Sequence, residues 1–266
     1  MKQYSDGGTR LPLKVFRISF LLIVLVGIGA GAWLTKLRVT GWDDPLRVVV
    51  YPINGDGSSA AESYIEALTP EVFGSVEQFM QDEGEQFGLS VAQPVSLRLA
   101  PEVTSLPPAP PFGGMVLETV LWSLQLRYWA WQHDTYQGAA AEVKLFVAYF
   151  DPDDFERLSD SLGLQKGLIG VVYAYADRRF AEKDNVIIAH EMLHTLGATD
   201  KYDPVTRQPL FPGGFADPER EPLLPQDLAE IMAGRRPLAD NETAMPESLY
   251  DVVIGEQTAR EIRWIR

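Results

Sequence analysis

The chain has 266 residues, and its 46% hydrophobic and 23% charged residues lie near globular averages, which excludes wholesale disorder. It contains no cysteine, which excludes disulfides, cysteine-ligated metals and thiol catalysis. Its formal net charge of −14 predicts that it binds no nucleic acid, because an acidic surface repels the phosphate backbone.

The N-terminal residues carry a membrane signal. Residues 1–17 are basic, and the apolar run Ile18–Leu34 that follows is at the lower end of what crosses a bilayer as a helix. More cations precede the run than follow it, so we expect a cytoplasmic segment at 1–17, a transmembrane signal anchor at 18–35 and a linker at 36–45. The body would then be periplasmic or extracellular.

A cleaved signal peptide is the alternative to this anchor. Ala30-Gly31-Ala32 has the small-x-small form that signal peptidase accepts. In that case residues 1–32 would be removed and the body would be secreted.

The body, residues 46–266, reads as one α/β layered domain with a mixed sheet. Arg47–Ile53 is β-branched and ends at Asn54-Gly55, which is typical of a buried strand. The further elements expected in chain order are a helix with a Ser59/Glu62 capping box that ends at Leu68, a helix from Pro70, a strand at Val95–Leu99, a long helix after the Pro-rich loop 101–114, and strands at Val143–Phe150 and Leu168–Tyr175.

The long helix carries large apolar residues at helical spacing, from Leu117 to Trp131. Its Trp122, Trp129 and Trp131 are interpreted as core residues rather than as a platform for a ligand.

Residues 185–203 read NVIIAHEMLHTLGATDKYD and contain the candidate metal-binding and catalytic residues. On a helix at about 100° per residue, the apolar side chains from Val186 to Leu196 cover one half of the circumference. His190 and His194 lie together outside that half, with Glu191 beside them. Two imidazoles one turn apart can bind one Zn²⁺ ion, and the adjacent carboxylate can take a proton from the activated water. The alternative is a solvated His-Glu-His edge of an ordinary helix.

A site with two histidines needs a third protein ligand. Gly197 is placed to end the helix in a left-handed conformation, after which Asp200 can reach the metal. The only other histidine, His133, is interpreted as a side chain at a helix end. The other acidic candidates are Asp203, Glu219, Glu221 and Glu230.

The pattern H-E-x-x-H-x-x-G-x-x-D, from His190 to Asp200, resembles the metzincin metalloproteases in their snapalysin-type form, with Asp as the third ligand. The resemblance implies a zincin fold: a mixed twisted sheet with packed helices, an active-site helix, a Met-turn at Met232 and a C-terminal helix over Ser248–Ile265. It also implies that a peptide docks as an extra strand along the strand Gly170–Asp177. Tyr202 becomes a candidate for oxyanion or substrate contact.

These features predict a membrane-anchored, zinc-dependent endopeptidase that acts on proteins or peptides. His190, His194 and Asp200 would bind the metal and Glu191 would be catalytic. Three alternatives stay open: an anchored binding module that keeps a metzincin fold without catalysis, a gluzincin-type peptidase with a downstream Glu ligand, and a cell-wall amide hydrolase.

Overall fold

The computed structural model describes residues 15–19, 22, 41–111, 116–158, 161–165 and 167–265. The chain forms two compact units, Met1–Val39 and Thr40–Arg266. In the first unit, the described residues are helical. The predicted anchor at 18–35 lies mostly outside the described residues, and none of the helices that are described has the length and apolar character needed to cross a membrane.

The second unit is built on a five-stranded sheet with the order β2-β1-β3-β5-β4. The neighbouring strands pair in parallel, except that β4 runs antiparallel to β5. A mixed α/β class is therefore confirmed. The strands are β1 (Leu46–Asn54), β2 (Val95–Leu99), β3 (Val143–Phe150), β4 (Leu162–Leu164) and β5 (Ile169–Tyr175).

Four of these strands lie where the sequence predicts them, but β4 was not expected. It has only three residues with a glycine in the middle, which is too short for a periodic pattern. β4 pairs with β5 over Leu162–Leu164, so the outer strand of the sheet is β4 there. The expectation that Gly170–Asp177 forms the edge is wrong for its first residues, Gly170 and Val171.

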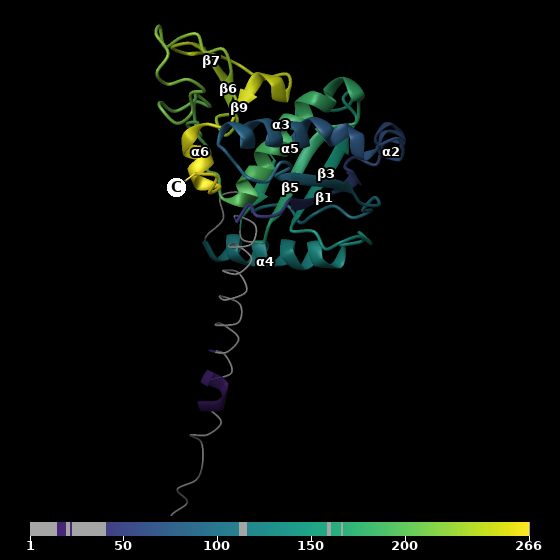
Figure 1. Ribbon diagram of the computed structural model, residues 1–266. Helices are drawn as coiled ribbons and strands as arrows, with labels where there is room; N and C mark the ends of the chain where they lie inside the picture. Colours follow the sequence, from purple (N-terminus) through teal and green to yellow (C-terminus); the bar gives the residue numbers. More distant parts are fainter. Residues whose placement is uncertain are drawn as a thin grey trace, which may run out of the picture. The chain divides into compact units, whose positions relative to one another are not determined.

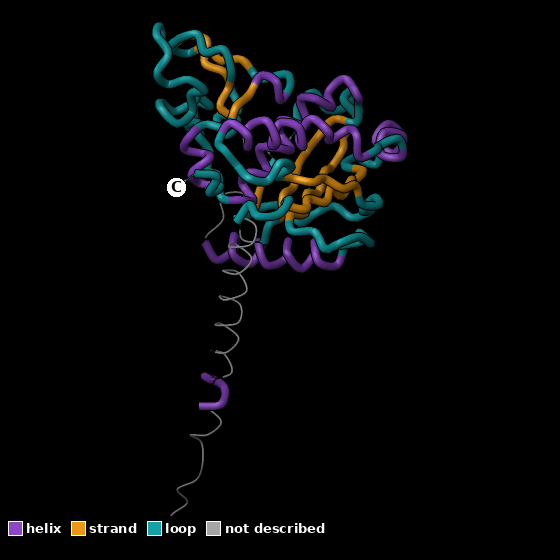
Figure 2. Tube along the Cα trace, viewed as in Figure 1, coloured by secondary structure: helices purple, strands orange, loops and turns teal. Residues whose placement is uncertain are grey.

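Helices cover both faces of the sheet, as parallel strands joined by crossovers require (Figures 1 and 2). α2 (Ser59–Glu66), α3 (Gly74–Gln86) and α5 (Ala181–Leu196) lie on one face, and α4 (Val116–Gln132) lies on the other. A 3-10 turn at Pro70–Phe73 leads into α3.

Helix α2 begins one residue earlier than its predicted cap. The N-cap is Ser58, whose side chain accepts a hydrogen bond from the amide of Ala61. The predicted capping box of Ser59 with Glu62 is therefore wrong, and the helix also ends at Glu66 rather than at Leu68.

Helix α4 closes an apolar core against its face of the sheet. Its Trp129 ring lies edge-on to Phe146 of β3, with 4.7 Å between the ring centroids. The buried residues of this core include Val49, Tyr51, Ile53, Leu126, Trp129, Ala130, Phe146, Ala148 and Val171.

The interpretation of the α4 tryptophans is only partly correct. Trp129 is buried and Trp122 packs against the core, but Trp131 is 70% exposed. The helix is apolar on both sides, and the sheet can cover only one of them.

The chain after α5 forms small elements instead of a long C-terminal helix. β6 (Ala229–Glu230) pairs in parallel with β9 (Val252–Val253), while β7 (Arg236–Ala239) and β8 (Glu242–Ala244) form a hairpin.

The helix predicted over Ser248–Ile265 is wrong apart from α6 (Glu256–Glu261). Ser248 and Asp251 form a capping box that closes a single 3-10 turn at Leu249–Asp251. The β-branched pair Val252-Val253 then joins the ladder with β6, so helix can resume only after Gly255.

Candidate metal centre

Helix α5 has the amphipathic structure that its sequence predicts. Its predicted apolar face is buried, with Ile188, Met192 and Leu196 each at most 1% exposed. His190 and His194 are half-buried, and Glu191 is 5% exposed. The helix therefore holds these three polar side chains on a rigid support.

Gly197 ends α5 as predicted, in the left-handed conformation with φ +113°. Its amide and that of Ala198 donate to the carbonyl of Leu193, which turns the chain sharply. This reversal brings Asp200 back beside the helix that it has just left.

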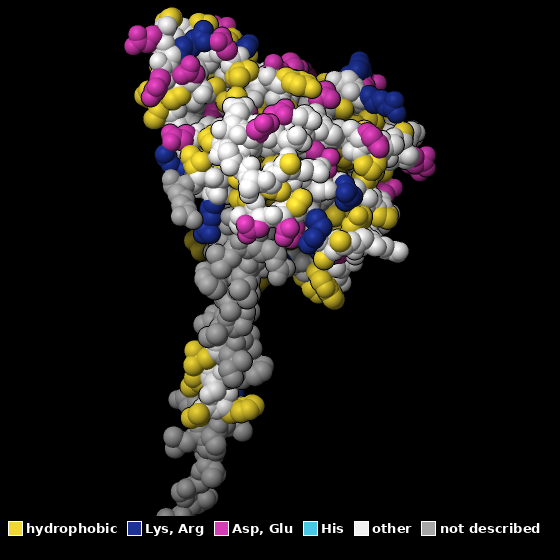
Figure 3. Space-filling view, viewed as in Figure 1, with side chains coloured by type: hydrophobic (Ala, Val, Ile, Leu, Met, Phe, Trp, Pro, Cys, Tyr) yellow, Lys and Arg dark blue, Asp and Glu magenta, His cyan; other side chains and the backbone are white. Residues whose placement is uncertain are grey.

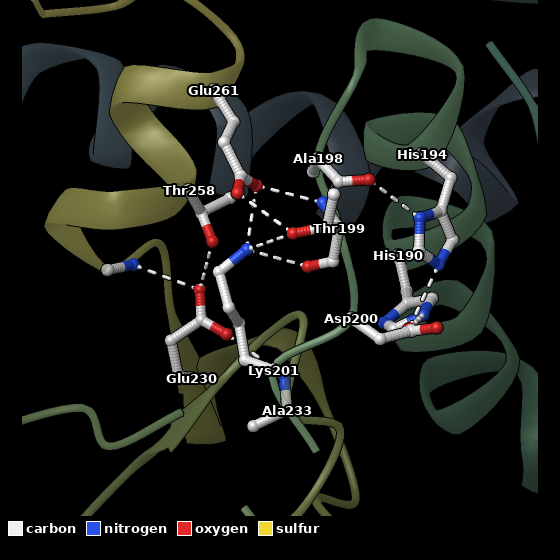
Figure 4. A network of polar contacts seen from close by, with 11 residues as sticks. His190, His194, Ala198, Thr199, Asp200, Lys201, Glu230, Ala233, Thr258 and Glu261 are labelled. Atoms are coloured by element: carbon white, nitrogen blue, oxygen red, sulfur yellow. Dashed lines mark hydrogen bonds and ion pairs between the residues drawn. The ribbon is translucent and has the colours of Figure 1, made fainter. Parts of the chain in front are cut away.

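His190, His194 and Asp200 point towards one another (Figure 4). Asp200 Oδ1 lies 3.4 Å from His190 Nε2 and 3.1 Å from His194 Nε2. One ligand atom from each residue lies within 4.8 Å of the others, so the group could hold a metal ion. Two imidazole nitrogens and a carboxylate oxygen are the donor types that Zn²⁺ takes in catalytic sites.

Backbone carbonyls fix both imidazole rings. The Nδ1 of His190 lies 2.9 Å from the carbonyl oxygen of Ile231, and the Nδ1 of His194 lies 2.8 Å from that of Ala198. Because a carbonyl oxygen can only accept, each Nδ1 carries a proton and donates it, and each Nε2 is turned towards Asp200. Metal-binding histidines are oriented in the same way.

The electrostatics of the cluster favour an anionic Asp200. Burial works to raise the pKa of Asp200, but hydrogen bonds from His190 and His194 outweigh it and hold the pKa well below its usual range. Burial works to lower the pKa of His190, while its bond to Asp200 and the charge of Glu191 raise it. The carboxylate is thus kept in the ionised form that binds metals.

Lys201 ties the Asp200 segment to the C-terminal helix (Figure 4). It is only 4% exposed, and its Nζ donates to Glu261 at 2.7 Å and to the carbonyl of Thr199 at 2.7 Å. Glu261 also accepts from the amide of Thr199 at 2.8 Å. The residues on both sides of Asp200 are therefore held in place.

A tight turn at Met232 packs against the same segments. The amides of Ala233 and Gly234 donate to the carbonyl of Glu230, and Met232 is fully buried. The carbonyl of Ile231 accepts from His190, and that of Met232 accepts from the amide of Lys201 at 2.9 Å. The turn expected at Met232 thus supports both α5 and the Asp200 segment through its backbone.

The other candidate ligands do not join the cluster. The carboxylate of Glu230 accepts from Thr258 and from the amide of Ala233. Asp203 accepts from the amides of Val205 and Thr206 within its own turn. Among the described residues, His190, His194 and Asp200 form the only such group, so neither Glu219 nor Glu221 takes part.

His133 lies in the α4 region, on the other face of the sheet. Its Nδ1 is 2.8 Å from the carbonyl oxygen of Trp129, and its ring stacks on the Trp129 ring. This agrees with its interpretation as a side chain at a helix end.

A cleft of about 420 Å³ opens beside His190 and Glu191. Tyr202 lines it, and the guanidinium of Arg207 lies 5.6 Å from the centroid of the Tyr202 ring. Arg157 and Arg235 line it as well. No pattern in the sequence marks these arginines, because they are far apart in the chain and belong to no motif.

Strand β4 passes close to Glu191. A Cβ added at Gly163 would lie 2.5 Å from the Glu191 carbonyl oxygen and 3.2 Å from its Oε2. Only glycine allows this approach, which brings the edge strand β4 next to the group of His190, His194 and Asp200. Neither Gly163 nor the Lys201–Glu261 pair gives a recognisable signal in the sequence, since both contacts join distant parts of the chain.

Comparisons with family models and with curated proteins found no relative of this chain. No family model matches the sequence, and no curated protein matches it significantly. The interpretation of the site therefore rests on its residues and their geometry.

Proposed function

We propose that the protein is a zinc-dependent endopeptidase with a metzincin-like site. The observation that carries the proposal is the convergence of His190, His194 and Asp200, with both imidazoles oriented by backbone carbonyls and Glu191 at the adjoining cleft. A purely structural zinc site would need a fourth protein ligand, whereas a catalytic site keeps one position open.

The zinc ion and the residues of the chain would contribute different steps to peptide hydrolysis. When bound, Zn²⁺ supplies Lewis acidity, which lowers the pKa of a water molecule and polarises the scissile carbonyl. Glu191 follows His190 directly on the helix and lines the same cleft. Its carboxylate accepts the proton of the attacking water and then donates it to the nitrogen of the leaving amine.

Strand β4 is the proposed docking edge for an extended peptide. It is one of the two edge strands of the sheet, and Gly163 brings its backbone next to Glu191. Backbone hydrogen bonds to an edge strand bind a peptide without regard to its sequence, and pockets then select among side chains.

The arginines of the cleft favour an acidic substrate. Arg157 and Arg235 have no hydrogen bond or ion pair with other described residues, and both line the cleft beside His190. A carboxylate on the peptide would form charge-assisted bonds with them. The body would act outside the cytoplasm, held at the membrane by the segment 18–35 that the sequence predicts as an anchor.

Replacing Glu191 with Gln tests the proposal. We expect Glu191→Gln to keep one Zn²⁺ per chain and to lose hydrolysis of acidic peptides by roughly 10²–10⁴-fold. Glu182→Gln, an exposed position in the first turn of the same helix, is the matched control and should hydrolyse at the normal rate. Equal hydrolysis by Glu191→Gln would refute the mechanism. Peptidoglycan fragments assayed in parallel would reveal a cell-wall amide hydrolase.

A further inference from the structure

Helix α4 exposes a series of large apolar side chains. Each is about half or more exposed, although Val, Leu, Tyr and Trp side chains normally bury most of their surface. They are Val116 (82%), Leu117 (64%), Val120 (49%), Leu121 (58%), Leu124 (52%), Tyr128 (59%) and Trp131 (70%). Hydrophobic side chains are visible in Figure 3 at the end of the body where Figure 1 shows α4.

These residues form one continuous stripe, which we call the α4 outer face. At about 100° per residue they occupy an arc of about 140° on the helix. The buried residues Leu126, Trp129 and Ala130 lie on the opposite side and pack into the core with the sheet. The outer face is therefore presented rigidly and away from the sheet.

Charged residues hardly interrupt the outer face. Arg127 falls within the arc, but it is half-buried and lies beside Gly167. Glu118 lies beyond the edge of the arc. A helix that is apolar on both sides is normally covered on both sides, and the sheet covers only the inner one.

We propose that the α4 outer face rests in the interfacial layer of a lipid bilayer. The length of the chain supports this occupant over a soluble partner. The sequence predicts a membrane anchor at 18–35, and ten linker residues at 36–45 can span at most roughly 36 Å. The body thus stays within reach of the bilayer in which its own anchor would lie.

The composition of the outer face agrees with a lipid contact. Tyr128 and Trp131 stand at its C-terminal end, and these two residue types are enriched at membrane interfaces. The contact would be apolar rather than electrostatic, because the chain is strongly acidic. α5 lies on the opposite face of the sheet, so α4 can contact lipid while the cleft stays open to protein substrates (Figure 1).

A single introduced cysteine tests this contact, since the natural chain has none. The full-length Leu121→Cys protein is labelled with a polarity-sensitive fluorophore and reconstituted into phosphatidylcholine vesicles that carry a quencher on the acyl chains. Val205→Cys, 88% exposed in a loop that follows the metal centre, is the matched control. We expect the label at 121 to be quenched by the lipid and shielded from aqueous iodide, with several-fold contrast to the label at 205.

Two results would overturn the proposal. Equal access of iodide to both labels would show that the outer face stays in water. A label at 121 that is shielded from both iodide and the lipid quencher would show that protein covers the face, either a second copy or another part of the chain.

Discussion

The two faces of the sheet differ in what they bury and in what they expose. On the α5 side, the side chains of Glu83 and Lys201 are buried and hydrogen-bonded, and that of Glu191 is buried as well. On the α4 side, the described core is a cluster of apolar and aromatic residues. The outward-facing side chains show the reverse pattern, since α5 turns two half-buried imidazoles towards Asp200 and α4 carries an exposed apolar stripe.

The α5 side is distinguished by its buried charged residues, and the α4 side by its exposed apolar residues. Buried charges cost free energy unless they are paired, so their concentration near α5 agrees with the metal centre proposed there. Exposed apolar residues cost little in the folded monomer but favour contact with another apolar phase. Each face can therefore be tested with substitutions that leave the other intact.

The largest effect is expected at the buried ion pair of Lys201 with Glu261. Lys201→Met leaves a partly buried carboxylate without its cation, which should lower the free energy of unfolding by about 4 kcal/mol. Because Lys201 adjoins Asp200, the affinity for Zn²⁺ should also fall by about 10–100-fold, as measured by competition with a chelator.

An exposed ion pair provides the control for Lys201. Arg260 and Glu256 pair on the surface of α6. Arg260→Ala should change the free energy of unfolding by less than about 0.5 kcal/mol and leave zinc affinity unchanged. If both variants behaved alike, the buried network would have no special role.

The two sides of α4 should respond very differently to the same substitution. Leu126 is 0% exposed and Leu121 is 58% exposed. Leu126→Ala should cost about 3 kcal/mol in urea unfolding because it leaves a cavity, whereas Leu121→Ala should cost less than about 0.5 kcal/mol. A similar loss in both would mean that the outer face is packed against the protein.

The buried acid Glu83 predicts a pH dependence of stability. Burial raises its pKa to about 7 from the ordinary 4.5, although the amide of Ile254 donates to it. The folded state then holds a proton that the unfolded state loses, so stability falls as the pH rises from 4.5 to 7 and levels off above that.

Glu83→Gln should remove this part of the pH dependence. The difference of about 2.5 pKa units corresponds to about 3 kcal/mol. The stability of the variant relative to that of the natural chain should therefore be higher at pH 8 than at pH 4 by up to this amount. Urea unfolding at the two pH values measures it, with the exposed Glu85→Gln on the same helix as control. Parallel pH curves for Glu83→Gln and the natural chain would contradict the assignment.

The smallest expected effect concerns charge selection in the cleft. Arg235→Gln should raise the KM for a peptide with a central Glu about tenfold and leave the KM for the Gln-containing analogue unchanged. Arg236→Gln, the neighbour that donates to the carbonyl of Asp227, is the control. Equal changes for both peptides would remove the proposed preference for acidic substrates.

Local patterns in the sequence correctly predicted the features that depend on contacts between residues close together in the chain. The apolar period of α5, the left-handed Gly197 and the spacing of His190, His194 and Asp200 all lie within one short segment, and the structure brings them together as expected. A helix and its cap need only neighbouring residues, so the sequence is sufficient there.

The features that the sequence could not predict depend on contacts between residues far apart in the chain. The orientation of α4 was ambiguous because apolar residues occur on both of its sides, and only the sheet decides which side is buried. β4 is too short for a pattern, and Val252-Val253 leave the predicted helix because β6 offers them a partner. The Lys201–Glu261 pair spans sixty residues, so no local signal exists for it.

Zinc stoichiometry of the full-length chain tests the central claim most directly. Metal analysis after removal of excess zinc should give one Zn²⁺ per natural chain. The value should be far below one for His194→Ala and Asp200→Ala. It should be unchanged for Asp203→Ala, because the carboxylate of Asp203 accepts hydrogen bonds from the amides of Val205 and Thr206 within its own turn. A natural chain that retains no zinc, or an Asp200→Ala chain that retains it fully, would contradict the proposed metal centre.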